Sequence, residues 1–131
     1  MAIEEFFSII DYIVDGPQTQ EAVISAFADI QRQWVAPYPG YLSAQFLASA
    51  DGTRVKCIVR WASEADFAHF EDVSDTKGRS EAIQQALRGL SCTAERRSFK
   101  LVRVVDPQTG PGAYQPDEAC GLPRGNGRAT S

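Results

Sequence analysis

The sequence predicts an α+β fold of the ferredoxin-like type, a βαββαβ sandwich in which one antiparallel sheet packs against two helical layers. Two observations carry this prediction. Four runs rich in β-branched and aromatic residues are separated by stretches of helical periodicity, and the dipeptide Asp51-Gly52 joins the second and third runs. The chain has 131 residues, enough for one domain with a core of its own. We expect that domain over residues 1–105 and a tail over residues 106–131.

The first strand is predicted at residues 6–14, FFSIIDYIV, whose composition is typical of a β-strand. It ends at Asp15-Gly16-Pro17, a combination that can end a strand and begin a helix. A helix is predicted over residues 19–35 because apolar side chains recur there at helical spacing. These side chains are Val23, Phe27, Ile30 and Trp34.

The second and third strands are predicted on either side of a tight turn. Pro37 and Pro39-Gly40 end the helix, and residues 41–49, YLSAQFLAS, then alternate loosely between apolar and polar. Asp51-Gly52 is a strong hairpin-turn signal, and TRVKCIVRW follows it at residues 53–61. These two strands are therefore expected to be antiparallel neighbours.

The second half of the chain is predicted to be helical and then extended. Ser63 with Asp66 three residues later resembles a capping box, and it precedes a short helix that carries Phe67 and Phe70 on one face. Residues 79–90 are expected to form a separate helical segment. The run RRSFKLVRVV at residues 96–105 is the predicted last strand.

The tail has a different composition. Glycine, proline and small polar residues dominate residues 106–131, so this segment has too little apolar area to offset the entropy of ordering it. We expect it to be disordered or to lie loosely on the surface.

Charge and composition exclude several classes of partner. The net charge of −4 and the isoelectric point near 4.9 argue against nucleic acid or an anionic membrane as the main partner, because both select basic patches. No window approaches the roughly 18 apolar residues of a membrane span. Glu4 and Glu5 stand where a signal peptide carries positive charge, so a cytoplasmic location is expected. The three cysteines form neither a disulfide framework nor a metal pattern, so no metal site is expected.

The sheet is predicted to be apolar on both faces. Side chains alternate across a strand, so Phe6 and Ile10 point one way and Phe7 and Ile9 point the other. Neither set suits a face in contact with water. We therefore predict a homodimer that forms through the sheet.

Trp61 is the main candidate for a binding site. It ends the third strand on the same face as Cys57, and the helix that carries Phe67 and Phe70 turns back over it. These residues could form the wall of a pocket or simply part of the core, and periodicity does not separate the two interpretations. The one histidine, His69, points away from that helix face, and a single histidine supplies too few ligands for a metal.

Four segments together resemble the antibiotic biosynthesis monooxygenases. They are VDGPQTQEAV, YPGYLSAQFLASADGT, the tryptophan of VRWASEADF, and RSEAIQQALRGL, and they run from about residue 10 to residue 90. The resemblance implies a dimer of ferredoxin-like units that forms an α/β barrel, and oxygenation of a polycyclic aromatic polyketide intermediate with O2. In the best-known members no metal or flavin takes part, and the deprotonated substrate itself reduces oxygen.

The resemblance also implies site residues, several of which differ here. The family's strand tryptophan corresponds to Trp61, its asparagine to Cys57 and its helical tyrosine to Phe67. Its arginine corresponds to Gln84 and its histidine to Leu47. We therefore predict Trp61 and Gln84 as catalytic residues. The predicted substrate-binding residues are Tyr12, Trp34, Gln45, Leu47, Cys57, Phe67 and Phe70.

These exchanges leave three functional hypotheses. The favoured one is implied by a resemblance in general outline to ring-opening members of the same family: oxidative C–C bond cleavage in an angucycline quinone. Those members draw on reduced flavin (FADH2 or FMNH2), here bound or diffusible, with a flavin reductase as a possible partner. A supplied reductant lessens the need for polar groups in the pocket. The second is a cofactor-free anthrone or phenol monooxygenase that gives a quinone, in which Tyr12, Gln45, Gln84 or Arg103 replaces the missing groups. The third is a polyketide-binding accessory protein without catalysis, or a cyclase. Oxygen consumption separates the third hypothesis from the other two.

Overall fold

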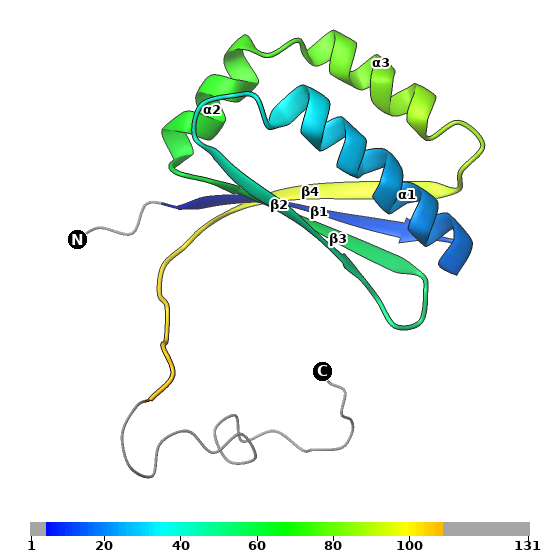
Figure 1. Cartoon of the computed structure of the whole chain (residues 1–131), viewed down its shortest axis with the longest axis horizontal. Helices are drawn as coiled ribbons and strands as arrows, with labels where there is room; N and C mark the ends of the chain where they lie inside the picture. The colour runs from blue at the N-terminus through cyan, green and yellow to red at the C-terminus, as the bar shows by residue number, and fades with distance from the viewer. Residues whose placement is uncertain (1–4, 109–131) are drawn as a thin grey trace.

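The computed structural model describes residues 5–108 and shows the predicted element order (Figure 1). The elements are β1 (Phe6–Val14), α1 (Pro17–Ile30), a π-helical turn η1 (Gln31–Val35), β2 (Tyr41–Ala48), β3 (Arg54–Trp61), α2 (Glu64–Val73), α3 (Thr76–Ala86) and β4 (Cys92–Lys100). This order confirms the ferredoxin-like α+β prediction.

The four strands form one antiparallel sheet in the order β2-β3-β1-β4. The first strand is therefore central, with β3 on one side and β4 on the other. Figure 1 shows all three α-helices over the same face of the sheet. That face is the inner face, and any cavity for a ligand has to lie between it and the helices.

The core lies between the inner face and the helices. Tyr12 of β1 stands opposite Val55 of β3, and Ile10 stands opposite Cys57, so these side chains share the inner face. Val23 and Phe27 of α1 pack down onto them and are buried. The largest side chain in this core, Trp61, is fully buried at the end of β3.

The outer face of the sheet is mixed in character, with no element of the described chain over it. Ile13, Leu47 and Phe99 are about half exposed there. Between them lie ion pairs, such as Lys56 with Asp11 at 3.1 Å. Both faces of the sheet therefore carry apolar side chains, as the alternation in the sequence predicted.

The boundaries of two helices differ from the sequence prediction. The predicted helix over residues 19–35 begins earlier, at Pro17, whose missing N–H is tolerated in a first turn. Its last residues form η1 instead of continuing as an α-helix, because the N–H of Ala36 donates to the carbonyl of Gln31 at 2.8 Å, five residues back. The helix predicted over residues 79–90 is α3, which begins at Thr76 after an Asp75 cap and ends at Ala86.

The last strand is displaced toward the N-terminus relative to its prediction. It was predicted at residues 96–105 and occupies Cys92–Lys100. It pairs with β1 from Val14 opposite Cys92 to Phe6 opposite Lys100. Residues 101–105 follow the point at which β1 begins, so the sheet offers them few further ladder partners.

The predicted tail lies outside the described residues from residue 109 onward. Residues 106–108 are exposed and have no regular secondary structure. Among the helices at residues 5–108, none has both the length and the apolar character that crossing a membrane requires.

Candidate active site

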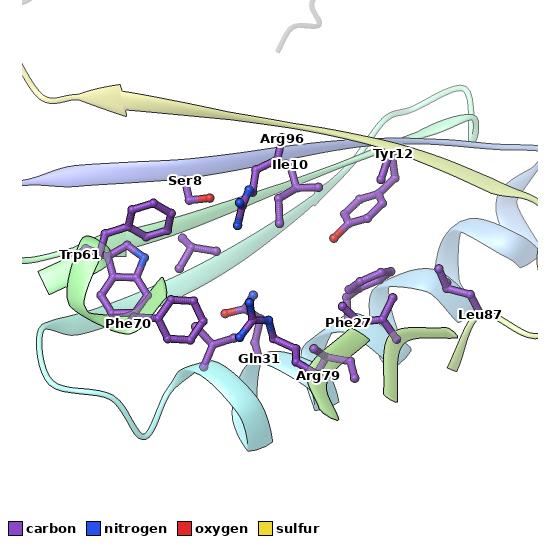
Figure 2. A pocket seen from close by; sticks show the side chains of 16 residues that line it. Ser8, Ile10, Tyr12, Phe27, Gln31, Trp61, Phe70, Arg79, Leu87 and Arg96 are labelled. Atoms are coloured by element: carbon purple, nitrogen blue, oxygen red, sulfur yellow. The ribbon is translucent and has the colours of Figure 1, made fainter. Parts of the chain in front are cut away.

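A cavity of about 290 Å³ lies between the inner face of the sheet and the helices (Figure 2). Its wall is mainly apolar, with a few polar groups from β1, η1, α3 and β4. The lining residues are Ser8, Ile10, Tyr12, Phe27, Ile30, Gln31, Val35, Val59, Trp61, Phe67, Phe70, Arg79, Ile83, Leu87, Ala94 and Arg96.

One end of the cavity is an aromatic wall centred on Trp61. The indole ring lies 5.8 Å from the Phe67 ring and 5.1 Å from the Phe70 ring, centroid to centroid. Both phenylalanines come from α2, whose first turn is capped by Ser63: its side-chain oxygen accepts from the Asp66 N–H at 3.1 Å. The cap turns the chain back at the end of β3, which brings α2 against the tryptophan.

Two buried polar atoms at this cavity have no hydrogen-bond partner in the described part of the chain. They are Nε1 of Trp61 and Oε1 of Gln31. Trp61 is 0% exposed and Gln31 is 8% exposed, so bulk water is almost excluded from both. Leaving a buried polar group unpaired costs roughly 1–3 kcal/mol. One donor and one acceptor in the cavity wall are therefore without a protein partner. Both atoms have almost no accessible surface, so a ligand pairs with them only if neighbouring side chains shift.

Tyr12 lies toward the opposite end, and its hydroxyl points into the cavity (Figure 2). Its ring packs on Phe27 with 4.6 Å between centroids. Burial, with smaller contributions from Cys57 and Cys92, raises the pKa of Tyr12 well above its usual range. The hydroxyl is therefore protonated at neutral pH, and it can act as a hydrogen-bond donor but is a poor base.

Two arginines reach the cavity from opposite sides. Figure 2 shows Arg96 extending from β4 toward the helices, while Arg79 of α3 lies on the helical side. The Arg79 guanidinium lies 4.7 Å from the centroid of the Phe70 ring, and its Nη1 donates to Oγ of Ser74 at 2.8 Å. Burial and then the neighbouring Arg96 lower the pKa of Arg79. Arg96 donates through Nη2 to Oε2 of Glu71 at 2.8 Å.

Four of the predicted site residues line this cavity: Tyr12, Trp61, Phe67 and Phe70. Cys57 is fully buried on the same face as Trp61 but does not line the cavity. Burial raises the pKa of the Cys57 thiol to about 12, so it is a protonated, small apolar side chain.

The other predicted residues lie elsewhere. Gln45 and Leu47 pair with Ile58 and Lys56 on the outer face of the sheet. Trp34 lines a separate groove between α1 and α3. Gln84 of α3 is exposed, because Ile83 one residue earlier faces the cavity and successive helical residues differ by about 100° in direction. The structure therefore does not bring Gln84 together with Trp61.

Four polar lining residues were missed: Ser8, Gln31, Arg79 and Arg96. Arg79 lies four residues before Ile83 of α3 and eight residues before Leu87, which directly follows α3. Both line the cavity, so the helical period pointed to Arg79. Arg96 pairs with Ile10 of β1, and its position followed from the correct strand register. Gln31 follows Phe27 and Val23 by four and eight residues, so the helical period placed it on the same buried face; it was missed because a glutamine does not stand out on a mainly apolar helix face.

The chemistry of the lining is that of a cationic and apolar site. The lining residues include no aspartate, glutamate or histidine. His69 and Arg103 are exposed and do not line the cavity. Within residues 5–108, no group of three or more His, Cys, Asp or Glu side chains is placed to hold a metal ion.

These features define a small ferredoxin-like protein with an apolar ligand cavity between its sheet and its helices. The family model described as antibiotic biosynthesis monooxygenase matches residues 14–89, more than half of the chain. The chain belongs to this family, as the sequence resemblance predicted, and is an oxygenase. A comparison with curated proteins found no significant match.

Solved structures show the same fold. One is a monooxygenase from the ActVA-Orf6 gene of Streptomyces coelicolor in complex with nanaomycin D, with a TM-score of 0.65, 26% identity, and coverage of 80% of this chain and 94% of that chain. A second is SnoaB of Streptomyces nogalater, a cofactor-independent oxygenase, with a TM-score of 0.55, 23% identity, and coverage of 78% and 97%. A third is a dimeric ferredoxin-like protein from an uncultured marine organism, with a TM-score of 0.57, 20% identity, and coverage of 78% and 99%.

Proposed function

We propose that this protein oxygenates a flat phenolic polycycle of the aromatic polyketide class, with the substrate supplying its own electrons to O2. The observation that carries the proposal is the pair of unpaired buried atoms, Trp61 Nε1 and Gln31 Oε1, in the wall of a mainly apolar cavity. A phenolic ring system offers an oxygen that accepts from the indole N–H and a hydroxyl that donates to the amide oxygen.

The size of the cavity supports a single aromatic ligand. Its volume of about 290 Å³ is at the lower end of the range of about 300–1,000 Å³ that is typical of ligand pockets. A volume of this size is suited to one flat polycycle and is small for a resident flavin together with a substrate. Nanaomycin D, the ligand of the Streptomyces coelicolor relative, supports a polycyclic ligand of this kind.

The polar groups of the lining favour an anionic form of the substrate. Positive charge near an ionisable group stabilises its charged form, so Arg79 and Arg96 lower the pKa of a phenol bound between them. The N–H of Trp61 at one end of the cavity, or the hydroxyl of Tyr12 at the other end, can donate to a substrate oxygen that gains negative charge. With these donors in place, the proton can leave to water, and a catalytic carboxylate or histidine is not required.

The reaction balances without an added reductant. A ring methylene of an anthrone-type substrate loses two hydrogens, one atom of O2 becomes the carbonyl oxygen of the quinone, and the other leaves as water. All four electrons that reduce O2 come from the substrate. The premise of the flavin hypothesis was that the family's polar groups had been lost, and Gln31, Arg79 and Arg96 supply polar groups at positions that the resemblance did not indicate.

A second candidate is ring opening of an angucycline quinone with reduced flavin. The absence of a carboxylate or histidine among the lining residues favours it, because a substrate that arrives with a separate source of electrons needs no deprotonation. Insertion of one oxygen atom into a C–C bond, with the other released as water, requires two electrons that the quinone does not supply. Reduced flavin from solution, delivered by a reductase, would provide them.

A homodimer completes the proposal. The half-exposed apolar side chains on the outer face, among them Ile13, Leu47 and Phe99, are suited to contact with a second sheet. The ferredoxin-like relative from the marine organism is dimeric. The cavity lies on the opposite face, so each protomer would keep a complete set of the lining residues described here.

Oxygen uptake tests the proposal and separates it from the alternatives. An anthrone and a dehydrorabelomycin-type angucycline are each incubated with the protein, with and without enzymatically reduced flavin. We expect uptake with the anthrone in the absence of flavin, a strong loss in Trp61→Phe, and no loss in Trp34→Phe, whose indole lies outside the cavity. Uptake only with the angucycline and reduced flavin would replace the first candidate by the second. No uptake under any condition would leave a binding protein or a cyclase.

A further inference from the structure

The lining of the cavity carries more positive charge than oxygenation of a phenol requires. Two of its side chains, Arg79 and Arg96, are cationic, and none is anionic. The whole chain has a net charge of −4, so this concentration of positive charge runs against the average of the sequence. Arg79 is half-buried and Arg96 is exposed, and the two like charges lie close enough to repel each other.

The contacts of the two arginines leave most of their donors free for a ligand. A guanidinium has five N–H donors. In the described part of the chain, the side-chain hydrogen bonds use Nη1 of Arg79, to Ser74, and Nη2 of Arg96, to Glu71. Each guanidinium also lies over an aromatic ring, Phe70 or Phe67, at 4.7 and 5.8 Å from the ring centroid. These contacts hold both cations at the cavity. Arg79 has no direct ion pair in the described part of the chain, but the charges of Glu71 and Asp75 act on it.

We propose that Arg79 and Arg96 form a carboxylate-binding subsite, so that the preferred substrate is a polycyclic aromatic acid. This inference rests on the proposed function, because it adds a second contact to the same ligand. The aromatic wall at Trp61 holds the ring system, and the arginines select for an acidic substituent. Arginine suits this role because its planar fork matches the geometry of a carboxylate.

Glu71 has a defined part in this subsite. It pairs with Arg96 across the gap between α2 and β4, and both side chains are partly exposed, at 39% and 48%. The pair holds the Arg96 side chain between α2 and β4. A substrate carboxylate competes with Glu71 for the same guanidinium, so Glu71→Gln is expected to strengthen acid binding severalfold.

Binding of two matched ligands tests the subsite. The probes are anthraquinone-2-carboxylate and anthraquinone-2-carboxamide, which have similar shapes and differ in charge. Quenching of Trp61 fluorescence is measured in a Trp34→Phe background, so that the signal comes from the cavity alone. The variants are Arg79→Gln and Arg96→Gln, and the control is Arg88→Gln, which removes one exposed positive charge just after α3. Circular dichroism and thermal unfolding verify that each variant is folded.

We expect the carboxylate to bind at least about tenfold more tightly than the amide, since charge-assisted hydrogen bonds are roughly twice as strong as neutral ones. The preference for the carboxylate over the amide should be smaller in Arg79→Gln and in Arg96→Gln, and it should decrease as salt is added. It should be unchanged in the control, Arg88→Gln. Equal affinities for the two probes, or a preference that survives both substitutions, would overturn the inference.

A phenolic probe separates the two possible sources of the anion. The probe is 1-hydroxyanthraquinone, whose binding is measured below and above the pKa of its phenol. The inference would be overturned if this probe bound tightly only above that pKa and the carboxylate probe showed no preference over the amide. The arginines would then be assigned to the phenolate. The proposed function would then still stand. Conversely, a preference for the acid without oxygen uptake from any phenol would refute the proposed function and leave the subsite in place.

Discussion

Two buried atoms define what the cavity can recognise. Trp61 Nε1 donates and Gln31 Oε1 accepts, and neither has a partner within residues 5–108. In a fold of this size, unpaired buried groups are few, and each has a cost that a bound ligand can remove. The same two atoms are therefore expected to matter more for binding than for stability.

Trp61→Phe tests this difference. The substitution keeps an aromatic ring against Phe67 and Phe70 but removes the indole N–H. We expect turnover of a phenolic substrate to fall about tenfold or more, as for loss of a hydrogen bond to a charged oxygen. The free energy of unfolding should change by no more than about 1–2 kcal/mol, because the lost packing is partly offset by removal of an unpaired donor. His69→Ala, at an exposed site, is the control and should leave turnover unchanged.

The buried thiol of Cys57 gives a prediction for stability at high pH. Burial raises the pKa of Cys57 from 9.0 to about 12 in the folded protein. Below pH 9 the thiol is protonated in both states, and above pH 9 it ionises only in the unfolded chain. The free energy of unfolding therefore falls as the pH rises from about 9 to 12. The Cys57 thiol contributes a slope of up to about 1.4 kcal/mol per pH unit.

Denaturant unfolding at pH 8, 9, 10 and 11 measures this slope. We expect a shallower fall in the free energy of unfolding in Cys57→Ala than in the wild type. Cys92→Ala is the matched control, because Cys92 is only partly buried and should contribute less. An identical slope in Cys57→Ala and the wild type would show that Cys57 ionises in the folded state as readily as in the unfolded chain.

At the scale of elements, the sequence predicted the order of strands and helices because each has a strong local pattern. The Asp51-Gly52 turn and the Ser63 cap were both confirmed, and both act within a few residues. The site was less predictable. Arg96 requires the register of β4 against β1, which is a contact between distant segments. Gln31 continues the buried series of Val23 and Phe27, but the pattern does not show that its amide oxygen is left unpaired.

The loop before β2 also positions α2 and therefore the aromatic wall. Gly40 has a φ of +87°, and a Cβ at this position would overlap the side-chain carboxyl of Asp66 in the first turn of α2. We expect Gly40→Ala to lower the free energy of unfolding by about 2–4 kcal/mol, from backbone strain and overpacking together.

Gly89→Ala is the control for strain alone. Its φ is +83°, and a Cβ there would meet no atom within 4 Å. We expect a cost of about 1–2 kcal/mol, measured by denaturant unfolding beside Gly40→Ala. Equal costs at the two glycines would contradict the close contact between the loop and α2.

At the scale of the whole molecule, one face of the sheet is covered by helices and the other is available for a partner. We expect the protein to be a dimer in solution, measured by light scattering coupled to size exclusion. Phe99, about half exposed on the outer face of β4, is suited to the interface, and Phe99→Glu should shift the protein to a monomer. Val105→Glu, at an exposed residue beyond the sheet, is the control. A dimer that persists in Phe99→Glu would place the interface elsewhere.

The source of the electrons is the central claim, and product mass under labelled O2 tests it most directly. An anthrone is converted by the purified protein in buffer free of flavin, under labelled oxygen gas, and the quinone is analysed by mass spectrometry. We predict one labelled oxygen atom per product molecule, formed faster with wild-type protein than with Trp61→Phe. A product without label, or labelled product only after reduced flavin is added, would contradict the claim that the substrate alone reduces oxygen in this cavity.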